Sequence, residues 1–230
     1  MRDRALLRGW GMATETYPAK RLPAGALVRF QPNGRILVAS GTHELGTGMY
    51  TVLAQVAAES LGLSPDLIDA QLGDTVLPQA PISAGSMSIA SVTPAVQLAA
   101  GKARLKLLSM ATEDARSPVH GARVDELDFK DGRIFLKRSP AVSEHYIALL
   151  ERNGNPPGEA SARTRPNEND DKYSAHSFGA VFTEVTVDSE LGIVRMPKVV
   201  AVYDVGRLLN EKTGKSQFIG GIVGALASAA

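Results

Sequence analysis

The sequence predicts an α+β fold in which helices pack on mixed or antiparallel sheets. Short apolar segments flank Asn-Gly and Asp-Gly turns, and four other segments place apolar residues at helical spacing. The expected order is ββαβα, ββα, a long loop and ββα, which is not a regular alternation of strand and helix. At 230 residues, the chain is long enough for one large domain or two small ones.

The first half of the chain contains a hairpin, a helix and a strand. Residues 26–40 form two apolar runs around an Asn-Gly turn, which is typical of a β-hairpin. Apolar residues from Met49 to Ala57 recur at helical spacing, and Gly62 and Pro65 are expected to end that helix. The segment LIDAQLG predicts a strand, and residues 74–91 are expected to form a loop.

Further elements follow with clear boundaries. A second helix is expected to start near Thr93 and Pro94, with Ser91 or Thr93 as its N-cap. Later segments are expected to form, in order, a hairpin at 127–137, a short helix at 143–152, long strands at 175–188 and 192–206, and a helix from Thr213.

The same pattern predicts four regions. They are an N-terminal extension at 1–25, a first α/β subdomain with a Gly-rich loop at 26–152, a flexible connection at 153–172 and a second subdomain at 173–230. The connection is assigned because it carries almost no apolar residues. The second subdomain is expected to contain two long strands and a C-terminal helix. The closing apolar run FIGGIVGALASAA favours a truncated product, with a short packed helix as the alternative.

Composition excludes several functions. The net charge of +1 gives no support to nucleic-acid binding, and no segment has the length and apolarity of a membrane span or signal peptide. The chain has no cysteine, which excludes disulfides, thiolate zinc sites and a cysteine nucleophile within it. Its four histidines show no metal-ligand spacing, so we expect no metal ligands.

Two loops rich in small residues are the candidate binding segments. Residues 46–51, GTGMYT, precede a helix whose unpaired N–H groups could face an anion. The loop fails as a dinucleotide fingerprint, because Thr51 replaces the third glycine and the order is not a plain βαβ unit. Residues 81–88, PISAGSMS, offer Ser83, Ser86 and Ser88 as donors. Each loop alone is equally compatible with a structural turn.

Few residues could perform chemistry. His43 and Glu44 form either a catalytic pair or a structural pair that orients the backbone. Glu184 and Asp188 are expected on one solvent-exposed face, and Asp204 is expected to be a buried carboxylate that caps a turn. No serine lies in a G-x-S-x-G turn, and no nucleophile–base set emerges.

Four segments, in order along the chain, resemble the molybdenum-binding large subunit of the xanthine dehydrogenase/aldehyde oxidase family. They are THELGTGMYTVLAQVAAESLGL, LGDTVLPQAPISAGSMSIASVTPAV, FGAVFTEVTVDSELGIVRMPKVVAVYDVGRLLN and SQFIGGIV. The LPQAPISAGS version is most similar to bacterial aldehyde-oxidising members with separate subunits. The resemblance implies the second molybdenum-cofactor-binding domain of that family.

The resemblance also implies a cofactor and a reaction. Family members bind molybdenum through molybdopterin, in bacteria usually its cytosine dinucleotide form, and hydroxylate aldehydes or N-heterocycles with oxygen from water. Electrons leave through iron–sulfur clusters and FAD on partner subunits. By this resemblance, the cofactor-binding residues would be Leu45, Gly46, Thr47, Gly85, Ser86, Ser88 and Gln217.

The sequence also departs from the family pattern. Thr47 stands where many members have glutamine, and Asn210-Glu211 replaces the usual Asn-Pro. The resemblance implies that the catalytic glutamate belongs to a Gly-x-Gly-Glu type motif beyond Ala230. We therefore assign no catalytic residue to these 230 positions, and expect the chain expressed alone to hold no molybdenum.

Three functional hypotheses follow. The first is a piece of a molybdenum hydroxylase catalytic subunit that works with iron–sulfur and FAD subunits and with the rest of its own subunit. The second is a non-catalytic remnant that acts as an assembly or binding module and self-associates as a homo-oligomer. The third is a stand-alone nucleotide-binding enzyme. We expect a cytoplasmic location, with co-export to the periplasm as the alternative, and no membrane or nucleic-acid partner.

Overall fold

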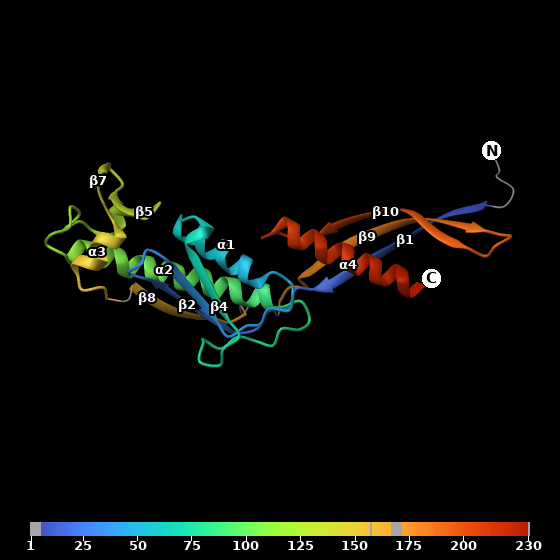
Figure 1. Ribbon diagram of the computed structural model, residues 1–230, viewed down its shortest axis with the longest axis horizontal. Coiled ribbons are helices and arrows are strands. Elements are labelled where there is room, and N and C mark those ends of the chain that lie inside the picture. The colour runs from blue at the N-terminus through green and yellow to red at the C-terminus, as the bar shows by residue number, and fades with distance from the viewer. Residues whose placement is uncertain (1–5, 157, 167–171, 230) are drawn as a thin grey trace. The chain divides into compact units, whose positions relative to one another are not determined.

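The computed structural model describes residues 6–156, 158–166 and 172–229. The chain divides into unit 1, residues 1–19 and 167–230, and unit 2, residues 20–166 (Figure 1). Both units combine strands with helices, which confirms the predicted α+β class with mixed and antiparallel sheets. The parts of the predicted extension and connection at 1–5, 157 and 167–171 lie outside the described residues.

Unit 2 is built around a four-stranded mixed sheet in the order β4-β3-β2-β8. Its strands are β2 (Ala24–Phe30), β3 (Ile36–Ser40), β4 (Ile68–Leu72) and β8 (Gly158–Thr164). β2 pairs antiparallel with β3 and β8, whereas β3 and β4 run parallel and are joined through a helix. The expectation that no βαβ order surrounds the Gly-rich loop is therefore wrong.

Two helices, α1 (Met49–Leu61) and α2 (Ser88–Glu113), pack on this sheet and on each other. The strands alternate so that Ala26, Val28 and Phe30 are buried on one face. The other face carries polar groups such as the Arg29–Glu159 ion pair, whose residues lie opposite each other on β2 and β8. The core of unit 2 therefore lies between one face of the sheet and the two helices.

A second, antiparallel sheet completes unit 2. It contains β5 (Leu127–Lys130), β6 (Arg133–Leu136) and β7 (Ser139–His145), followed by α3 (Tyr146–Arg152). Short 3-10 helices occupy Pro65–Leu67 and Val124–Glu126. Edge-to-face contacts of Phe30 with Phe129 and Tyr146 join the two sheets. The buried Tyr146 hydroxyl donates to the Gly34 carbonyl at 2.7 Å, which fixes the turn between β2 and β3.

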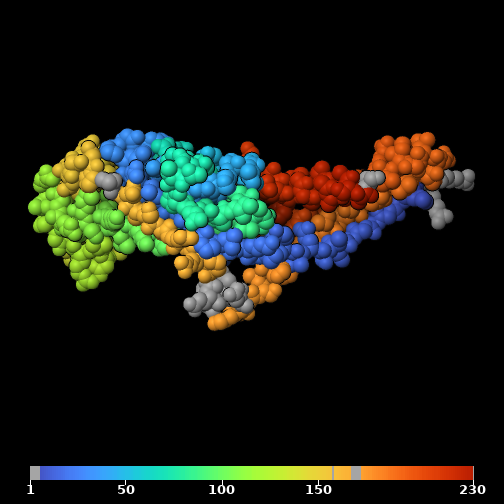
Figure 2. Space-filling model, turned by 90° about the horizontal axis from the view of Figure 1, so that it is seen from below, coloured from blue at the N-terminus to red at the C-terminus, as the bar shows by residue number. Residues whose placement is uncertain are grey.

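The described residues of unit 1 form a three-stranded antiparallel sheet and one helix. The strands β1 (Leu6–Pro18), β9 (His176–Asp188) and β10 (Val194–Asp204) lie in the order β1-β9-β10. Helix α4 (Glu211–Ala229) contacts β10 through stacked rings of Phe218 and Tyr203, whose centroids are 4.2 Å apart. β1 lies at the surface along its whole length (Figure 2).

Three predicted boundaries are wrong. Residues 6–18, assigned to an extension, form β1, and residues 158–164, assigned to a flexible connection, form β8. Residues 143–145, assigned to a helix, belong to β7. β1 and β8 are held by main-chain pairing to distant strands, which leaves no local apolar pattern, whereas residues 143–145 extend the local pairing of β7 with β6.

Helix α2 starts earlier than predicted. It begins at Ser88 with Met87 as N-cap, so Pro94 lies inside the helix and neither Ser91 nor Thr93 is the cap. Instead, the Ser91 and Thr93 hydroxyls donate to the carbonyls of Met87 and Ile89, four residues earlier, at 2.7 and 2.9 Å. These side-chain bonds reach the Met87 and Ile89 carbonyls and not the Ala90 carbonyl, to which Pro94 cannot donate.

Candidate functional site

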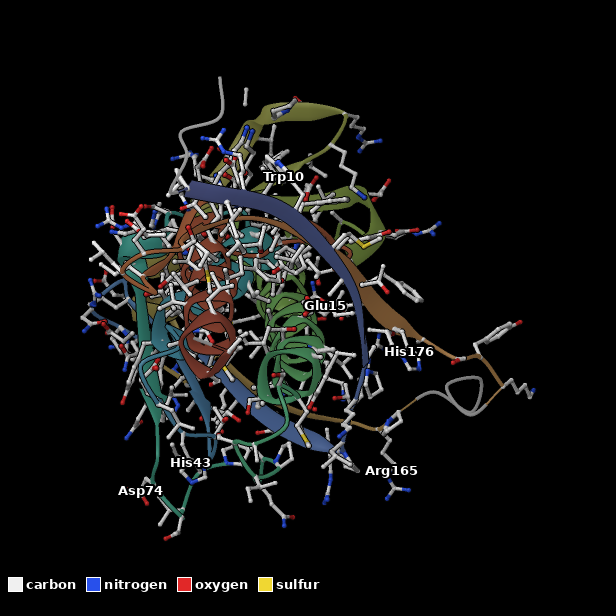
Figure 3. All side chains as sticks on the ribbon, turned by 90° about the vertical axis from the view of Figure 1, so that its right-hand side faces the viewer. Trp10, Glu15, His43, Asp74, Arg165 and His176 are labelled. Atoms are coloured by element: carbon white, nitrogen blue, oxygen red, sulfur yellow. The ribbon has the colours of Figure 1, made fainter. Side chains whose placement is uncertain are left out.

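The parallel pairing of β3 and β4 brings the two candidate loops together. Ser40, the last residue of β3, lies opposite Leu72, the last residue of β4. The first loop, residues 41–48, and the second loop, residues 73–87, therefore leave the sheet at the same edge. The Gly73 N–H donates to the Thr42 carbonyl at 2.9 Å, which joins the loops where they begin. His43 and Asp74 mark this edge in Figure 3.

The second loop packs closely against glycines of the sheet. The Gly41 N–H donates to the Pro78 carbonyl at 2.8 Å, and a Cβ at Gly41 would lie 3.1 Å from the same oxygen. The Gly25 N–H donates to the Gln79 carbonyl at 2.7 Å. A side chain at Gly41 would make an unusually tight contact with the Pro78 carbonyl, so glycine favours this close approach of the second loop.

Ser83 links the two loops directly. Its hydroxyl oxygen accepts from the His43 N–H at 3.3 Å and lies 3.1 Å from His43 Nδ1. The Thr42 hydroxyl is 3.5 Å from the same oxygen. One serine side chain thus ties together segments that are 40 residues apart in the sequence. We refer to this contact as the Ser83 link.

Most of the predicted binding residues lie on these two loops. Leu45, Gly46, Gly85 and Ser86 are exposed, Thr47 is half-buried, and Ser88 is the half-buried first residue of α2. Gln217 is exposed on α4 and belongs to unit 1. The structure therefore places five of the seven predicted residues on two linked loops of unit 2, and a sixth, Ser88, directly after the second loop.

The backbone of both loops is open and tightly curved. Gly46 has a φ of 86°, and a Cβ placed there would meet no atom within 4 Å. On the second loop, Gly85 and Ser86 have φ of 58° and 56°. A positive φ is costly for serine, and such strain is concentrated at functional sites. These loops therefore present exposed main chain that a flat ligand can approach.

Glu44 has a role that the sequence did not reveal. Its carboxylate accepts hydrogen bonds from Gly48 N–H at 3.1 Å and Tyr50 N–H at 3.4 Å. The expectation that the N–H groups at the start of α1 are unpaired is therefore wrong for these two groups. The His43 ring contacts Ser83 instead, so Glu44 and His43 have different partners.

Two other expected carboxylate environments are wrong. Glu184 is buried on β9 and pairs with Arg8, with 3.1 Å between Glu184 Oε1 and Arg8 Nε, because β1 covers it. Asp204, expected to be buried, is exposed and accepts from Gly206 N–H at 3.4 Å. The error at Glu184 arises from β1, whose pairing with β9 the sequence pattern did not indicate, whereas Asp204 caps a turn as expected but lies at the exposed end of β10.

Within residues 6–156, 158–166 and 172–229, no group of three or more His, Asp or Glu side chains is arranged to hold a metal ion. Among the helices of this part of the chain, none has the length and apolarity needed to cross a membrane.

Comparisons with known proteins agree with this geometry. Residues 1–230 match the sequence family described as a molybdopterin cofactor-binding domain. The chain is 32% identical over 220 residues to the aldehyde oxidoreductase molybdenum-binding subunit PaoC of Escherichia coli O157:H7. It is 29% identical over 231 residues to the putative xanthine dehydrogenase molybdenum-binding subunit XdhA of Escherichia coli K12.

These alignments cover most of this chain but a minor part of each relative. They include 96% of this chain and 28% of PaoC, and 94% of this chain and 29% of XdhA. Among solved structures, quinoline 2-oxidoreductase from Pseudomonas putida 86 matches with a TM-score of 0.79 at 22% identity, over 96% of this chain and 30% of that chain. CO dehydrogenase from Oligotropha carboxidovorans matches with a TM-score of 0.77 at 24% identity, over 94% of this chain and 28% of that chain.

The structural matches show a shared fold, and the sequence match confirms the resemblance found in the four quoted segments. They favour the first of the three hypotheses over a remnant module. Because the family description matches all 230 residues, the chain belongs to the molybdopterin cofactor-binding domain family.

Proposed function

We propose that the two linked loops of unit 2 bind the molybdopterin cofactor as part of a molybdenum hydroxylase catalytic subunit. Leu45, Gly46 and Thr47 would contact it from the first loop, and Gly85, Ser86 and Ser88 from the second. The role of Gln217, on α4 of unit 1, stays a prediction from the sequence resemblance alone. The reaction class is hydroxylation of aldehydes or N-heterocycles with oxygen derived from water.

The Ser83 link carries this proposal. Main-chain bonds from Gly73 to Thr42 and from Gly41 to Pro78 join the loops where they begin, and the Ser83 side chain adds the contact that is nearest in sequence to residues 45–47 and 85–88. The hydrogen bonds of Ser83 to His43, at 3.1 and 3.3 Å, hold both turns at one edge of the sheet. Ligands of open α/β sheets bind outside the carboxyl ends of parallel strands, which is where β3 and β4 end.

The residues present fit an organic cofactor better than a bare ion. Gly46 leaves open space beside its main chain, and the second loop adds the hydroxyls of Ser86 and Ser88. Exposed N–H groups and hydroxyls can bond the polar edges of a pterin and can hold it in a fixed orientation. When bound, the cofactor would supply the metal centre that accepts electrons from the substrate. The chain's own loops would bind and orient it.

The relatives' names support the assembly that we propose. PaoC and XdhA are both named as molybdenum-binding subunits, which implies partner subunits. We propose that this chain acts with iron–sulfur and FAD subunits and uses the cytosine dinucleotide form of the cofactor. We also propose that the catalytic glutamate is supplied from outside these 230 residues, and that the complex is cytoplasmic unless a partner exports it.

A binding titration tests the cofactor surface. Isotope-labelled chain is titrated anaerobically with molybdopterin cytosine dinucleotide, and amide shifts are followed by NMR. We expect shifts at residues 45–47 and 85–88, and none with NAD at the same concentration. Ser83→Ala removes the link and should weaken binding about tenfold, since it deletes hydrogen bonds together worth about 1–1.5 kcal/mol. Ser161→Ala, on the exposed face of β8, is the matched control.

Two results would contradict the proposal. One is an absence of shifts at both loops up to the solubility limit of the cofactor. The other is an equal affinity of Ser83→Ala and Ser161→Ala for the cofactor, although the two loops have separated in Ser83→Ala. Elemental analysis gives a further check, because we expect no stoichiometric molybdenum in the chain purified alone. Tight molybdenum with aldehyde oxidation would refute our placement of the catalytic carboxylate.

A further inference from the structure

The carboxylate of Glu44 folds back over the first turn of α1. Its Oε1 atom accepts from Gly48 N–H at 3.1 Å and its Oε2 atom from Tyr50 N–H at 3.4 Å. Both bonds close a ring around residues 45–47, which are three of the proposed cofactor-binding residues. Gly46 and Gly48 complete the ring with φ of 86° and 85°, a conformation that glycine adopts at little cost.

This ring decides which main-chain groups of the first loop can bind a ligand. The N–H groups of Gly48 and Tyr50 are satisfied by the chain's own anion. Within the described part of the chain, the N–H groups of Leu45 and Gly46 have no hydrogen-bond partner, and both residues are exposed. The negative charge of Glu44 at the start of α1 also disfavours a phosphate there. The loop is therefore suited to an uncharged, hydrogen-bond-accepting part of a ligand.

We infer that Glu44 is a positioning residue, whose carboxylate holds Leu45, Gly46 and Thr47 in the shape that receives the neutral part of the cofactor. This inference rests on the proposed function of the first loop. It assigns a role to Glu44, which lies between β3 and α1. The gain is entropic, because a loop ordered before binding does not have to be ordered by the ligand.

The ionisation of Glu44 agrees with this role. Burial by itself would raise the pKa of its carboxyl group, but main-chain N–H groups of Gly48, Met49 and Tyr50 together outweigh burial and lower the pKa. At neutral pH the group is thus a hydrogen-bond acceptor and a weak base. A carboxylate whose lone pairs are used by the backbone is poorly suited to accept a proton from a substrate.

Hydrogen exchange tests the ring in the 230-residue chain without any cofactor. We expect Glu44→Ala to increase amide exchange at Gly48 and Tyr50 at least tenfold, because both lose their acceptor. Glu44→Gln keeps one carbonyl oxygen and places an NH₂ group against the other N–H, so its loss of protection should be intermediate. Glu113→Gln, at an exposed position near the end of α2, removes the same charge away from the loops and is the matched control.

Cofactor titration of the same variants tests positioning. We expect Glu44→Ala to bind molybdopterin about tenfold more weakly, the cost of ordering roughly one further residue, and Glu44→Gln to recover part of the loss. The amides of Gly85 and Ser86 should respond to the cofactor in every variant, which shows that the second loop is intact. Circular dichroism checks that both variants are folded. If Glu44→Ala is unfolded, the milder Glu44→Gln is used to test the positioning role.

The two possible failures can be told apart. If the unmodified chain shows no response at residues 45–47, the proposed function of the loop fails first. If that chain responds, and Glu44→Ala loses amide protection while binding molybdopterin within twofold of normal, the positioning role of Glu44 is refuted. Unchanged amide protection in Glu44→Ala would also refute it, because the carboxylate would then not hold the loop.

Discussion

Single carboxylates bind at one end of each of two helices in unit 2, the start of α1 and the end of α2. Glu44 accepts from the first N–H groups of α1, as described above. Asp114, the residue that follows α2, accepts from the Arg116 N–H at 3.0 Å, from Asn153 Nδ2 at 3.0 Å and from the Arg152 guanidinium. Arg152 also pairs with the buried Glu144, with 2.6 Å between Nη2 and Oε2. These polar contacts tie α3 to the end of α2.

The contacts of Asp114 make stability depend on pH. The Arg116 N–H and the Arg152 guanidinium hold the pKa of the Asp114 carboxyl well below its usual value. A folded-state pKa below the unfolded one contributes stability above the unfolded pKa, near 4, which is lost as pH falls towards the folded pKa. We therefore expect Asp114→Asn to lower the Tm at pH 7 and to lessen its decline between pH 5 and 2. Thermal unfolding by circular dichroism across this range provides the measurement.

Asp125→Asn serves as the control, because the Asp125 side chain is exposed and pairs with Arg123 at the surface. Its Tm profile should follow that of the unmodified chain. If both variants gave the same profile of Tm against pH, the Asp114 contacts would not contribute to the pH dependence of stability.

At the level of elements, α2 combines an unfavourable sequence with a favourable environment. Pro94 cannot donate to the Ala90 carbonyl and lies in the interior of the helix. The helix persists because Val92, Ala95, Val96, Ala99 and Ala103 are buried against the sheet. Small side chains on α2 face alanines at 24, 26, 160 and 162, so helix and sheet can pack closely.

Replacing this proline should stabilise unit 2. Pro94→Ala restores one helical hydrogen bond and is expected to raise the free energy of unfolding by about 1–2 kcal/mol, after allowing for the greater entropy of the unfolded chain. Urea denaturation followed by circular dichroism measures the change. Gln97→Ala, at an exposed position one turn later, should alter stability by less than about 0.5 kcal/mol. A loss of stability in Pro94→Ala would mean that the proline ring itself packs favourably.

At the level of the whole molecule, the two units differ in their cores. All buried apolar side chains of the described residues belong to unit 2. In unit 1, α4 lies on the face of the sheet that carries Tyr203. By strand alternation and register, Trp10, Met12, Phe178, Phe182, Val200 and Val202 share the opposite face, and all six are exposed. Trp10 marks this face in Figure 3.

Such a face should make the chain associate with itself in isolation. We expect size-exclusion chromatography with light scattering to give a mass above that of one chain, rising with concentration. The variant Trp10→Ser/Met12→Ser/Val202→Ser should shift the distribution towards the monomer. Leu105→Ser, an exposed apolar residue of unit 2, is the control and should leave association unchanged. A clean monomer of the unmodified chain at all concentrations would contradict this expectation.

The sequence by itself determined the elements whose signals are local. Apolar periodicity and Gly62 defined α1, turn residues defined the hairpins at 26–40 and 127–137, and alternation defined β9 and β10. The four quoted segments also identified the family, which the comparison confirmed. These features depend on residues that are close together in the chain.

Only the tertiary structure decided how distant segments meet. β1 and β8 are stabilised by pairing with strands more than 100 residues away, so no local pattern marks them. The parallel pairing of β3 and β4 places residues 41–48 beside residues 73–87, and the Ser83 link completes the contact. The role of Glu44 depends on the direction in which its side chain folds back over α1. Hydrogen bonds between groups far apart in sequence, or set by one rotamer, leave no periodic signal in the amino-acid order.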